Sequence, residues 1–130
     1  MEPRFLLDTN SVIYYTNDDL PQKASDFLDK EIPKGIFLSV ISEIELLGFN
    51  TPTEREALIV ESFVVGSSVI PLIRPIILKT IDIRKAYKIK LPDAIIAATA
   101  LVYDLTLISR NDEDFRKITG LKYINPFTDL

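Results

Sequence analysis

Short apolar runs that alternate with segments of helical character constrain the fold of this chain more than any other feature. Each run is typical of a buried β-strand. The runs are "RFLLD", "IFLSVI", "SVIPLI", "TLIS" and "KYIN", at residues 4–8, 36–41, 68–73, 106–109 and 122–125. Segments with helical spacing or helix caps lie at residues 22–32, 42–49, 51–66, 75–88, 93–103 and 112–118. Because strands joined by helices pair in parallel, the pattern predicts an α/β fold, a three-layer α/β/α sandwich around a mostly parallel central sheet of about five strands.

The composition limits the chemistry that is available. The chain has no cysteine and no histidine, which excludes disulfides, thiolate or imidazole metal sites and Ser-His or Cys-His nucleophiles. A net charge of −4 argues against a general nucleic-acid coat protein, which would be basic. With 130 residues and no linker or repeat, the chain is expected to form one domain over residues 1–130. We find no signal-peptide pattern and no apolar run long enough to cross a membrane, so we expect a cytoplasmic protein.

Local signals at segment ends refine this pattern. Thr51 is placed to cap the helix of residues 51–66, and Glu54 would complete a capping box with it. Gly66 would end the same helix. Pro71 interrupts the run at 68–73, which predicts a short strand or one at the edge of the sheet.

Acidic and polar side chains follow the predicted strands. Asp8 ends the first, and Glu45 follows the second. Asp112 and Asp114 follow the strand "TLIS". Since the carboxyl ends of parallel strands meet at one edge of a sheet, these acids are expected to converge there. Asp93 opens an apolar helix that leads into "TLIS", and an antiparallel packing of this helix would bring its start to the same edge.

Each of these residues also has a purely structural interpretation. Asp8 with Asn10 can form an Asx turn and a helix cap, and Ser42 with Glu45 reads as a capping box. Asp93 can favour the helix dipole, which is worth roughly 0.3–1 kcal/mol. For the last helix, Asn111 or Asp112 is a candidate cap.

The acids taken together favour a metal site. They interrupt the most apolar segments, "FLLDT", "VISEIELL" and "LPDAIIAA", and no Lys or Arg is adjacent to Asp8, Glu45 or Asp93. Clustered anions repel one another, and burial raises the cost of their charge. A hard divalent cation such as Mg²⁺ or Mn²⁺ would resolve this conflict, because these ions take oxygen ligands and leave room for a substrate phosphate.

Four segments carry a family resemblance. "LLDTNSVIYY", "LSVISEIELLG", "LPDAIIAATAL" and "LISRNDEDF" occur in the order and spacing of the PIN-domain ribonucleases. The chain resembles in particular the VapC-type toxins of bacterial and archaeal toxin–antitoxin pairs, over nearly its whole length. This resemblance implies that Asp8, Glu45 and Asp93 are catalytic and bind the metal ion. It also implies that Asn10 orients ligands or water and that Ser42 supports the site.

The fourth acidic position of the resemblance is open. Many relatives place an Asp two residues after a Thr, where this chain has Asn111 after Ser109. Asp112 is taken as the fourth catalytic residue, and Asp112 or Asp114 as the metal ligand, with Asn111 in a supporting role. Glu43 is the weaker alternative to Glu45.

The resemblance implies a function. It is Mg²⁺- or Mn²⁺-dependent hydrolysis of RNA phosphodiester bonds, with 5′-phosphate and 3′-hydroxyl products. A small antitoxin protein and a homodimer are the implied partners. The alternative is a non-catalytic PIN-like module that binds RNA or protein. A phospho-receiver domain and an aspartyl phosphatase are disfavoured, because "SVIPLI" carries no acid and because Asn10 stands where the phosphatase needs its second acid.

RNA binding also needs cations. Arg110 follows a strand at the proposed edge and is the preferred substrate contact. The run "KTIDIRKAYKIK" at residues 79–90 holds five cations and one acid, and we interpret it first as a solvated helix face. Tyr14 and Tyr15 can stack on bases, but helix-face packing or an interface is the preferred interpretation.

Overall fold

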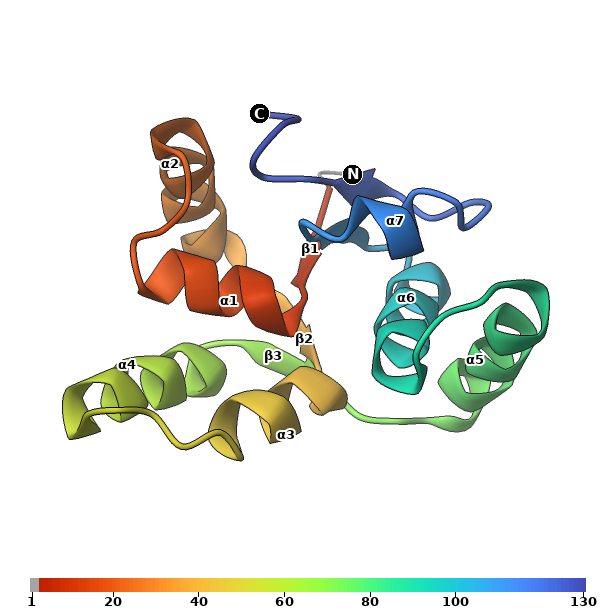
Figure 1. Ribbon diagram of the computed structural model, residues 1–130, viewed down its shortest axis with the longest axis horizontal. Helices are drawn as coiled ribbons and strands as arrows, with labels where there is room; N and C mark the ends of the chain where they lie inside the picture. Colours follow the sequence, from red (N-terminus) through yellow and green to blue (C-terminus); the bar gives the residue numbers. More distant parts are fainter. Residues whose placement is uncertain (1–2) are drawn as a thin grey trace.

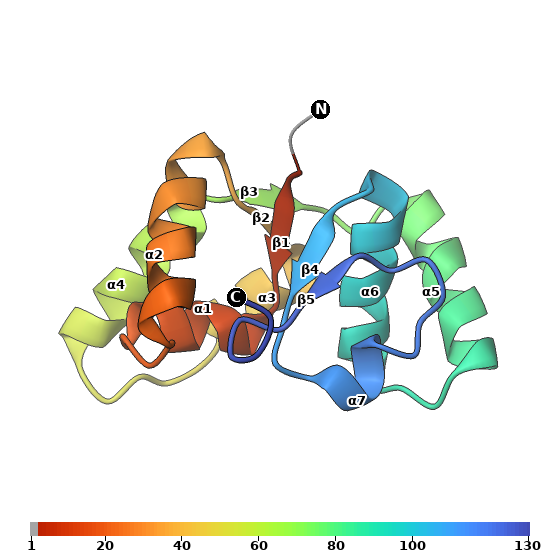
Figure 2. The ribbon, with the colours of Figure 1, turned by 90° about the horizontal axis from the view of Figure 1, so that it is seen from above.

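Five parallel strands form the central sheet of the computed structural model, which describes residues 3–130. Their order across the sheet is β3-β2-β1-β4-β5 (Figures 1 and 2). The strands are β1 (Phe5–Leu7), β2 (Phe37–Ser39), β3 (Ser68–Ile70), β4 (Thr106–Ile108) and β5 (Tyr123–Ile124). Each lies within a run that the sequence identified as a strand, and β3 is at an edge of the sheet, as Pro71 predicted.

Seven α-helices connect or flank these strands in the described chain. They are α1 (Thr9–Thr16), α2 (Gln22–Glu31), α3 (Val40–Leu47), α4 (Glu54–Val65), α5 (Arg74–Ala86), α6 (Leu91–Tyr103) and α7 (Asp112–Phe115), with a 3₁₀ turn η1 at Ile32–Lys34. Six of them correspond to predicted helical segments. Helix α1 was missed as an element, because its sequence shows only a weak helical spacing of apolar residues. In the structure, only Ser11 and Val12 of this helix are buried.

The helices cover both faces of the sheet and give the predicted three layers. Successive strand residues point to opposite faces. Leu6 and Leu107 pack with α5 and α6, whereas Leu7 and Ile108 pack with α1, α2, α3 and α4. Figure 2 shows the strands between these two groups of helices. Small side chains on α6, including Ala97, let it lie close against α5, the most extensive helix pair of the fold.

Two predicted helix starts were wrong by a few residues. The cap of α4 is Thr53 and not Thr51: its hydroxyl accepts a hydrogen bond from the amide of Glu56 at 3.1 Å. The cap of α3 is Ser39, which accepts from the amide of Ile41, so β2 is shorter than expected and Ser42 lies inside the helix. In both cases two Ser or Thr residues are candidates, and the one at which the backbone turns from extended to helical becomes the cap.

Helix α6 brings its start to the carboxyl ends of the strands. It begins at Leu91, runs antiparallel to β4 and ends at Tyr103, just before that strand (Figure 2). Strands β1 and β4 end beside one another, and the amide of Asp8 donates to the carbonyl of Ile108 at 3.2 Å. The starts of α1, α6 and α7 therefore lie at the same end of the sheet. Among the described helices, none combines the length and the apolarity that crossing a bilayer requires.

Candidate active site

Asp8 is a buried carboxylate at the junction of β1 and α1. Only 7% of its surface is exposed. Its Oδ1 accepts a hydrogen bond from the amide of Ser11 at 2.9 Å, so it caps α1 as the structural interpretation suggested. Burial raises the pKa of Asp8, hydrogen bonds from Ser109 and Ser11 lower it, and the charge of Glu45 raises it. Within residues 3–130, no Lys or Arg lies within 4 Å of this carboxylate.

Asp93 is the third residue of α6 and is half-buried. Its pKa is raised to about 6, first by burial and then by the charges of Asp114, Asp8 and Glu45, while Lys90 lowers it. A carboxylate feels such repulsion only from charges that lie near it. The charges of Asp8, Glu45 and Asp114 therefore act on Asp93 from separate parts of the chain, and we refer to these four residues as the carboxylate group.

Glu45 is tied to α1 through Thr9. The Thr9 hydroxyl lies 2.5 Å from Oε1 of Glu45 and 3.1 Å from Oγ of the buried Ser42. Thr9 thus orients a candidate ligand, and Ser42 supports this contact from inside α3. Residues two apart on an α-helix point roughly 200° apart, so Glu43 faces a different side of α3 from Glu45. Sequence reasoning missed Thr9, whose only signal was its place directly after Asp8.

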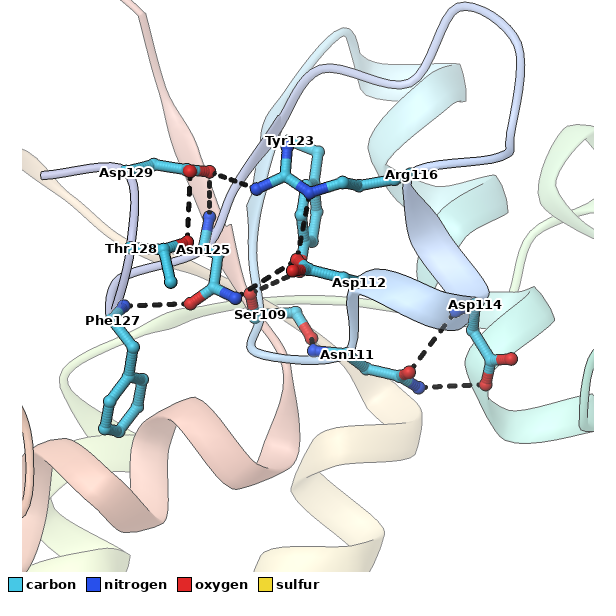
Figure 3. A network of polar contacts seen from close by, with 10 residues as sticks. All are labelled: Ser109, Asn111, Asp112, Asp114, Arg116, Tyr123, Asn125, Phe127, Thr128 and Asp129. Atoms are coloured by element: carbon cyan, nitrogen blue, oxygen red, sulfur yellow. Dashed lines mark hydrogen bonds and ion pairs between the residues drawn. The ribbon is translucent and has the colours of Figure 1, made fainter.

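Asp112 and Asp114, two of the three acids of α7, point in different directions (Figure 3). Asp112 accepts hydrogen bonds from the Tyr123 hydroxyl at 2.7 Å and from Nδ2 of Asn125 at 3.1 Å (Figure 3). It also pairs with Nε of Arg116 at 3.1 Å. These donors hold the pKa of Asp112 below its usual value, chiefly through Tyr123 and Asn125. Asp114 lies on the other side of α7 and adds to the charge around Asp93 (Figure 3).

Arg116 extends the contacts of Asp112 to the end of the chain. Its Nη2 donates to Oδ2 of Asp129 at 2.7 Å, and the same oxygen accepts the amide of Asn125 at 2.8 Å (Figure 3). We refer to the set Asp112, Arg116, Tyr123, Asn125 and Asp129 as the C-terminal clamp. The clamp satisfies Asp112 with protein donors, namely Tyr123, Asn125 and Arg116.

Asn111 and Ser109 hold the region around β4 and α7. Asn111 caps α7, accepting from the amide of Asp114, and its Nδ2 donates to Oδ2 of Asp114 at 2.8 Å. The buried Ser109 accepts from the amide of Asn111 at 3.0 Å and also hydrogen-bonds Asp8. Asn111 therefore orients Asp114, while its predicted supporting role in a metal site stays a prediction, and Ser109 is a contact of Asp8 that sequence reasoning did not assign.

Arg110 is exposed and lies over aromatic rings. Its guanidinium carbon is 4.0 Å from the ring centroid of Phe127 and 5.8 Å from that of Tyr14. The two rings meet edge to face at 5.2 Å. Tyr15 hydrogen-bonds Asp29 and packs on Phe63. Both tyrosines therefore have packing partners, the preferred interpretation of the sequence.

Asn10 is exposed in the first turn of α1. It lines a cavity of about 590 Å³ between α1, α3 and α4, together with Thr9 and Glu45. Asn10 is therefore open to a ligand or water next to the carboxylate group.

The carboxylate group fits a hard divalent cation in charge and in donor type. In residues 3–130, no three Asp or Glu side chains stand close enough together to enclose a metal ion. All four members nevertheless offer oxygen atoms, which Mg²⁺ and Mn²⁺ prefer. Asp8 is buried without a cationic partner, and burial followed by the charges of three acids raises the pKa of Asp93, so a divalent ion would relieve repulsion that Lys90 offsets only in part.

Comparisons with known proteins agree on one family. The family model described as the PIN domain matches residues 5–121. No curated protein sequence is significantly similar to the chain.

Several solved structures share the fold. A DNA-bound VapBC complex from Salmonella typhimurium has a chain with a TM-score of 0.80 at 23% identity, covering 95% of this chain and 98% of that one. VapBC2 from Rickettsia felis, bound to a DNA fragment from its promoter, gives 0.78 at 22% identity, covering 93% and 97%. A toxin–antitoxin complex from Klebsiella pneumoniae gives 0.75 at 28% identity, covering 94% and 97%.

Proposed function

The chain belongs to the PIN domain family, and on this premise we propose that it is a divalent-metal-dependent endoribonuclease that serves as the toxin of a toxin–antitoxin pair. The observation that carries the proposal is the placement of four acids at the carboxyl ends of the strands: Asp8 directly after β1, where it is buried without a cationic partner, Glu45 on α3, Asp93 at the start of α6 and Asp114 on α7. Acids brought together from distant positions without cationic partners destabilise a fold, and this cost is consistent with a function in metal binding.

Asp8, Glu45, Asp93 and Asp114 would hold the metal ion. Asp114 replaces Asp112 as the preferred fourth acid, because the C-terminal clamp already satisfies Asp112 and directs it elsewhere. When bound, Mg²⁺ or Mn²⁺ supplies a water of lowered pKa and neutralises charge on the scissile phosphate.

Neutral donors keep the ligands in place. The Ser11 amide fixes Asp8, Thr9 orients Glu45, and Asn111 orients Asp114. Neutral donors hold a carboxylate without cancelling its charge, which leaves the charge for a cation. Arg110, exposed beside the group, contacts a phosphate of the substrate and is oriented by Phe127.

The same family relation supports a proposal about the binding partners of the chain. The Klebsiella pneumoniae structure is described as a toxin–antitoxin complex and the other two as VapBC, and we propose that this chain binds a small antitoxin and forms a homodimer in the cytoplasm. Exposed apolar side chains on and near α3 and α4 offer a surface for a protein partner. They are Ile44, Leu47 and Phe49 on and after α3, and Leu58 on α4.

The second candidate is a non-catalytic PIN-like module that binds RNA or protein. Asn111, which stands where many relatives place an acid, favours it, as does the absence of three enclosing carboxylates in the described residues. The two candidates differ in one measurable property, turnover.

RNA cleavage by the purified full chain tests the proposal. We expect cleavage of single-stranded RNA in Mg²⁺ or Mn²⁺ and none in EDTA. Asp93→Asn should abolish it, whereas Asp82→Asn, an exposed acid on α5, should cleave like the wild type when prepared identically. Metal-dependent RNA binding without turnover would favour the non-catalytic module. Equal cleavage by the wild type and Asp93→Asn would reveal a contaminating nuclease and reject the proposed role of Asp93.

A further inference from the structure

A groove with an excess of positive charge opens beside the carboxylate group. It lies between the end of α5, the connection to α6 and helix α7, which are neighbours at one end of the molecule in Figure 2. The groove has a volume of about 640 Å³. Its basic members are Arg84, Lys88, Lys90 and Lys117, and we refer to it as the basic groove.

The four cations of the basic groove are exposed and lack carboxylate partners. Glu113 and Asp114 are the acids that line the same groove, so the lining holds two more positive than negative charges. None of the four cations forms an ion pair within 4 Å in the described part of the chain. This local excess contrasts with the net charge of −4 of the whole protein.

Contacts between distant segments fix the walls of the groove. Nζ of Lys117, beyond α7, donates to the carbonyl of Lys88 at 2.9 Å. The hydroxyl of Tyr87 accepts the amide of Thr119 at 3.1 Å and lies 3.2 Å from its Oγ1. The connection at residues 87–90 is thereby held against the segment that follows α7, and the cations are carried by a fixed support.

We propose that the basic groove binds backbone phosphates of the RNA strand next to the bond that is cleaved. This inference rests on the proposed function and names a second contact region for its substrate. Asp114 belongs both to the carboxylate group and to the lining of the groove, so a strand that leaves the site on this side passes directly over the cations. Lys and Arg supply the phosphate contacts of nucleic-acid interfaces.

The lining also indicates that the groove does not recognise bases. Among the described residues that line it, there is no aromatic side chain on which a base could stack. Its contribution is therefore electrostatic, independent of sequence and sensitive to salt. The Arg110 side of the site differs, because there the cation is accompanied by Tyr14 and Phe127.

The test compares two double variants with equal loss of charge. Arg84→Gln/Lys88→Gln removes two cations from the groove, and Lys79→Gln/Lys85→Gln removes two from the same run, at exposed positions that do not line the groove. Lys90 and Lys117 are left intact because Lys90 acts on Asp93 and Lys117 holds the groove wall. RNA cleavage gives KM and kcat, and binding of single-stranded RNA to Asp93→Asn backgrounds gives Kd against salt.

We expect the groove variant to raise KM several-fold with kcat within about twofold, and the control pair to change little. Each lost phosphate contact should lower the slope of log K against log salt by about 0.7 for a single strand. If the wild type cleaves RNA and both double variants have the same KM and the same salt slope, the proposed role of the basic groove is rejected. The proposed nuclease function would then still stand. If the wild type does not cleave RNA, the proposed function fails. The slope of log K against log salt for RNA binding then tests by itself whether the basic groove binds phosphates. The inference would also be rejected if the groove variant changed only the binding of an acidic protein partner and left RNA binding and KM as in the wild type.

Discussion

Asp112 and Asp114 stand two residues apart on α7 and belong to regions with opposite electrostatics. In the C-terminal clamp, each acid has protein donors: Asp112 has Tyr123, Asn125 and Arg116, and the pKa of Asp112 is lowered. In the carboxylate group, burial first and then the charges of other acids raise the pKa values of Asp8 and Asp93.

The difference teaches how to separate structural from functional acids. A carboxylate that stabilises the fold is surrounded by donors that lower its pKa, and its charge adds to stability. A carboxylate kept for a ligand is held by neutral groups and keeps a charge that the fold does not cancel. The carboxylate group therefore reduces the stability of the metal-free protein, while the clamp increases it.

The largest expected effect comes from replacing the two acids of this comparison, Asp114 and Asp112, one at a time. Asp114→Asn should lower metal-dependent RNA cleavage by about a hundredfold or more, since even partners outside the ligand shell of a metal cost 10–100-fold when removed. Asp112→Asn should leave kcat within a few-fold and lower the thermal midpoint, because the charge that pairs with Arg116 is lost. Cleavage rates and thermal unfolding of both variants check this. The reverse pattern would return the catalytic role to Asp112.

The next effect concerns stability alone. Tyr123→Phe removes the hydroxyl that donates to the Ser109 carbonyl or to Asp112, each at 2.7 Å. We expect a loss of about 1 kcal/mol in the free energy of unfolding, the usual value for one net hydrogen bond. Urea unfolding measures the loss, and cleavage per folded molecule should remain near that of the wild type. A loss of turnover at full stability would show that the clamp acts in catalysis.

Stability measured across a pH series sharpens the contrast, because the raised pKa of Asp93 and the lowered pKa of Asp112 change the stability with pH in opposite directions. The folded-state pKa of Asp93, about 6, lies above the usual value of 3.8, so the folded protein binds a proton between these pH values and the unfolded chain does not. Metal-free protein should therefore lose stability as the pH rises from about 4 to 6, by an amount on the order of 1 kcal/mol after allowance for solvent screening.

The control for this series is Asp93→Asn, which should lack that loss of stability and be the more stable protein at pH 7. The clamp predicts the opposite sign at lower pH: the contribution of Asp112 is present above its unfolded pKa and disappears as the pH falls through its lowered folded pKa. Urea unfolding in EDTA across the pH range measures both. Parallel curves for the wild type and Asp93→Asn would contradict the raised pKa.

The smallest effect tests whether the two regions communicate. Oδ1 of the clamp residue Asn125 accepts a hydrogen bond from the amide of Phe127 at 2.8 Å (Figure 3). The guanidinium of Arg110 lies over the Phe127 ring. Phe127→Leu should raise KM for RNA about threefold with kcat unchanged, since a cation–π contact at an exposed site is worth about 0.5–1 kcal/mol. Steady-state kinetics check this. An unchanged KM would mean that Arg110 needs no support from the C-terminal segment.

Much of the fold could be predicted from sequence because its signals are local. The five apolar runs, the edge position indicated by Pro71 and the apolar helix after Asp93 depend on neighbouring residues, and all are confirmed. Helix α1 was missed, because its burial comes from contacts with other elements and leaves no regular spacing in "TNSVIYYT". The caps at Thr53 and Ser39 were displaced for a similar reason, since two hydroxyl residues competed at each start.

For the candidate site, the sequence by itself determined which acids stand at the ends of strands and at the head of α6, because strand order and chain direction place Asp8, Asp93 and the acids after β4 at one edge. Only the tertiary structure shows that Asp112 and Asp114 have different neighbours, and the proposal of Asp114 as the fourth ligand rests on this difference. Their directions depend on Tyr123, Asn125 and Asn111, and the first two lie 11 and 13 residues away from Asp112. Whether a charge is cancelled or left free is a property of its neighbours in space, which a linear pattern does not contain.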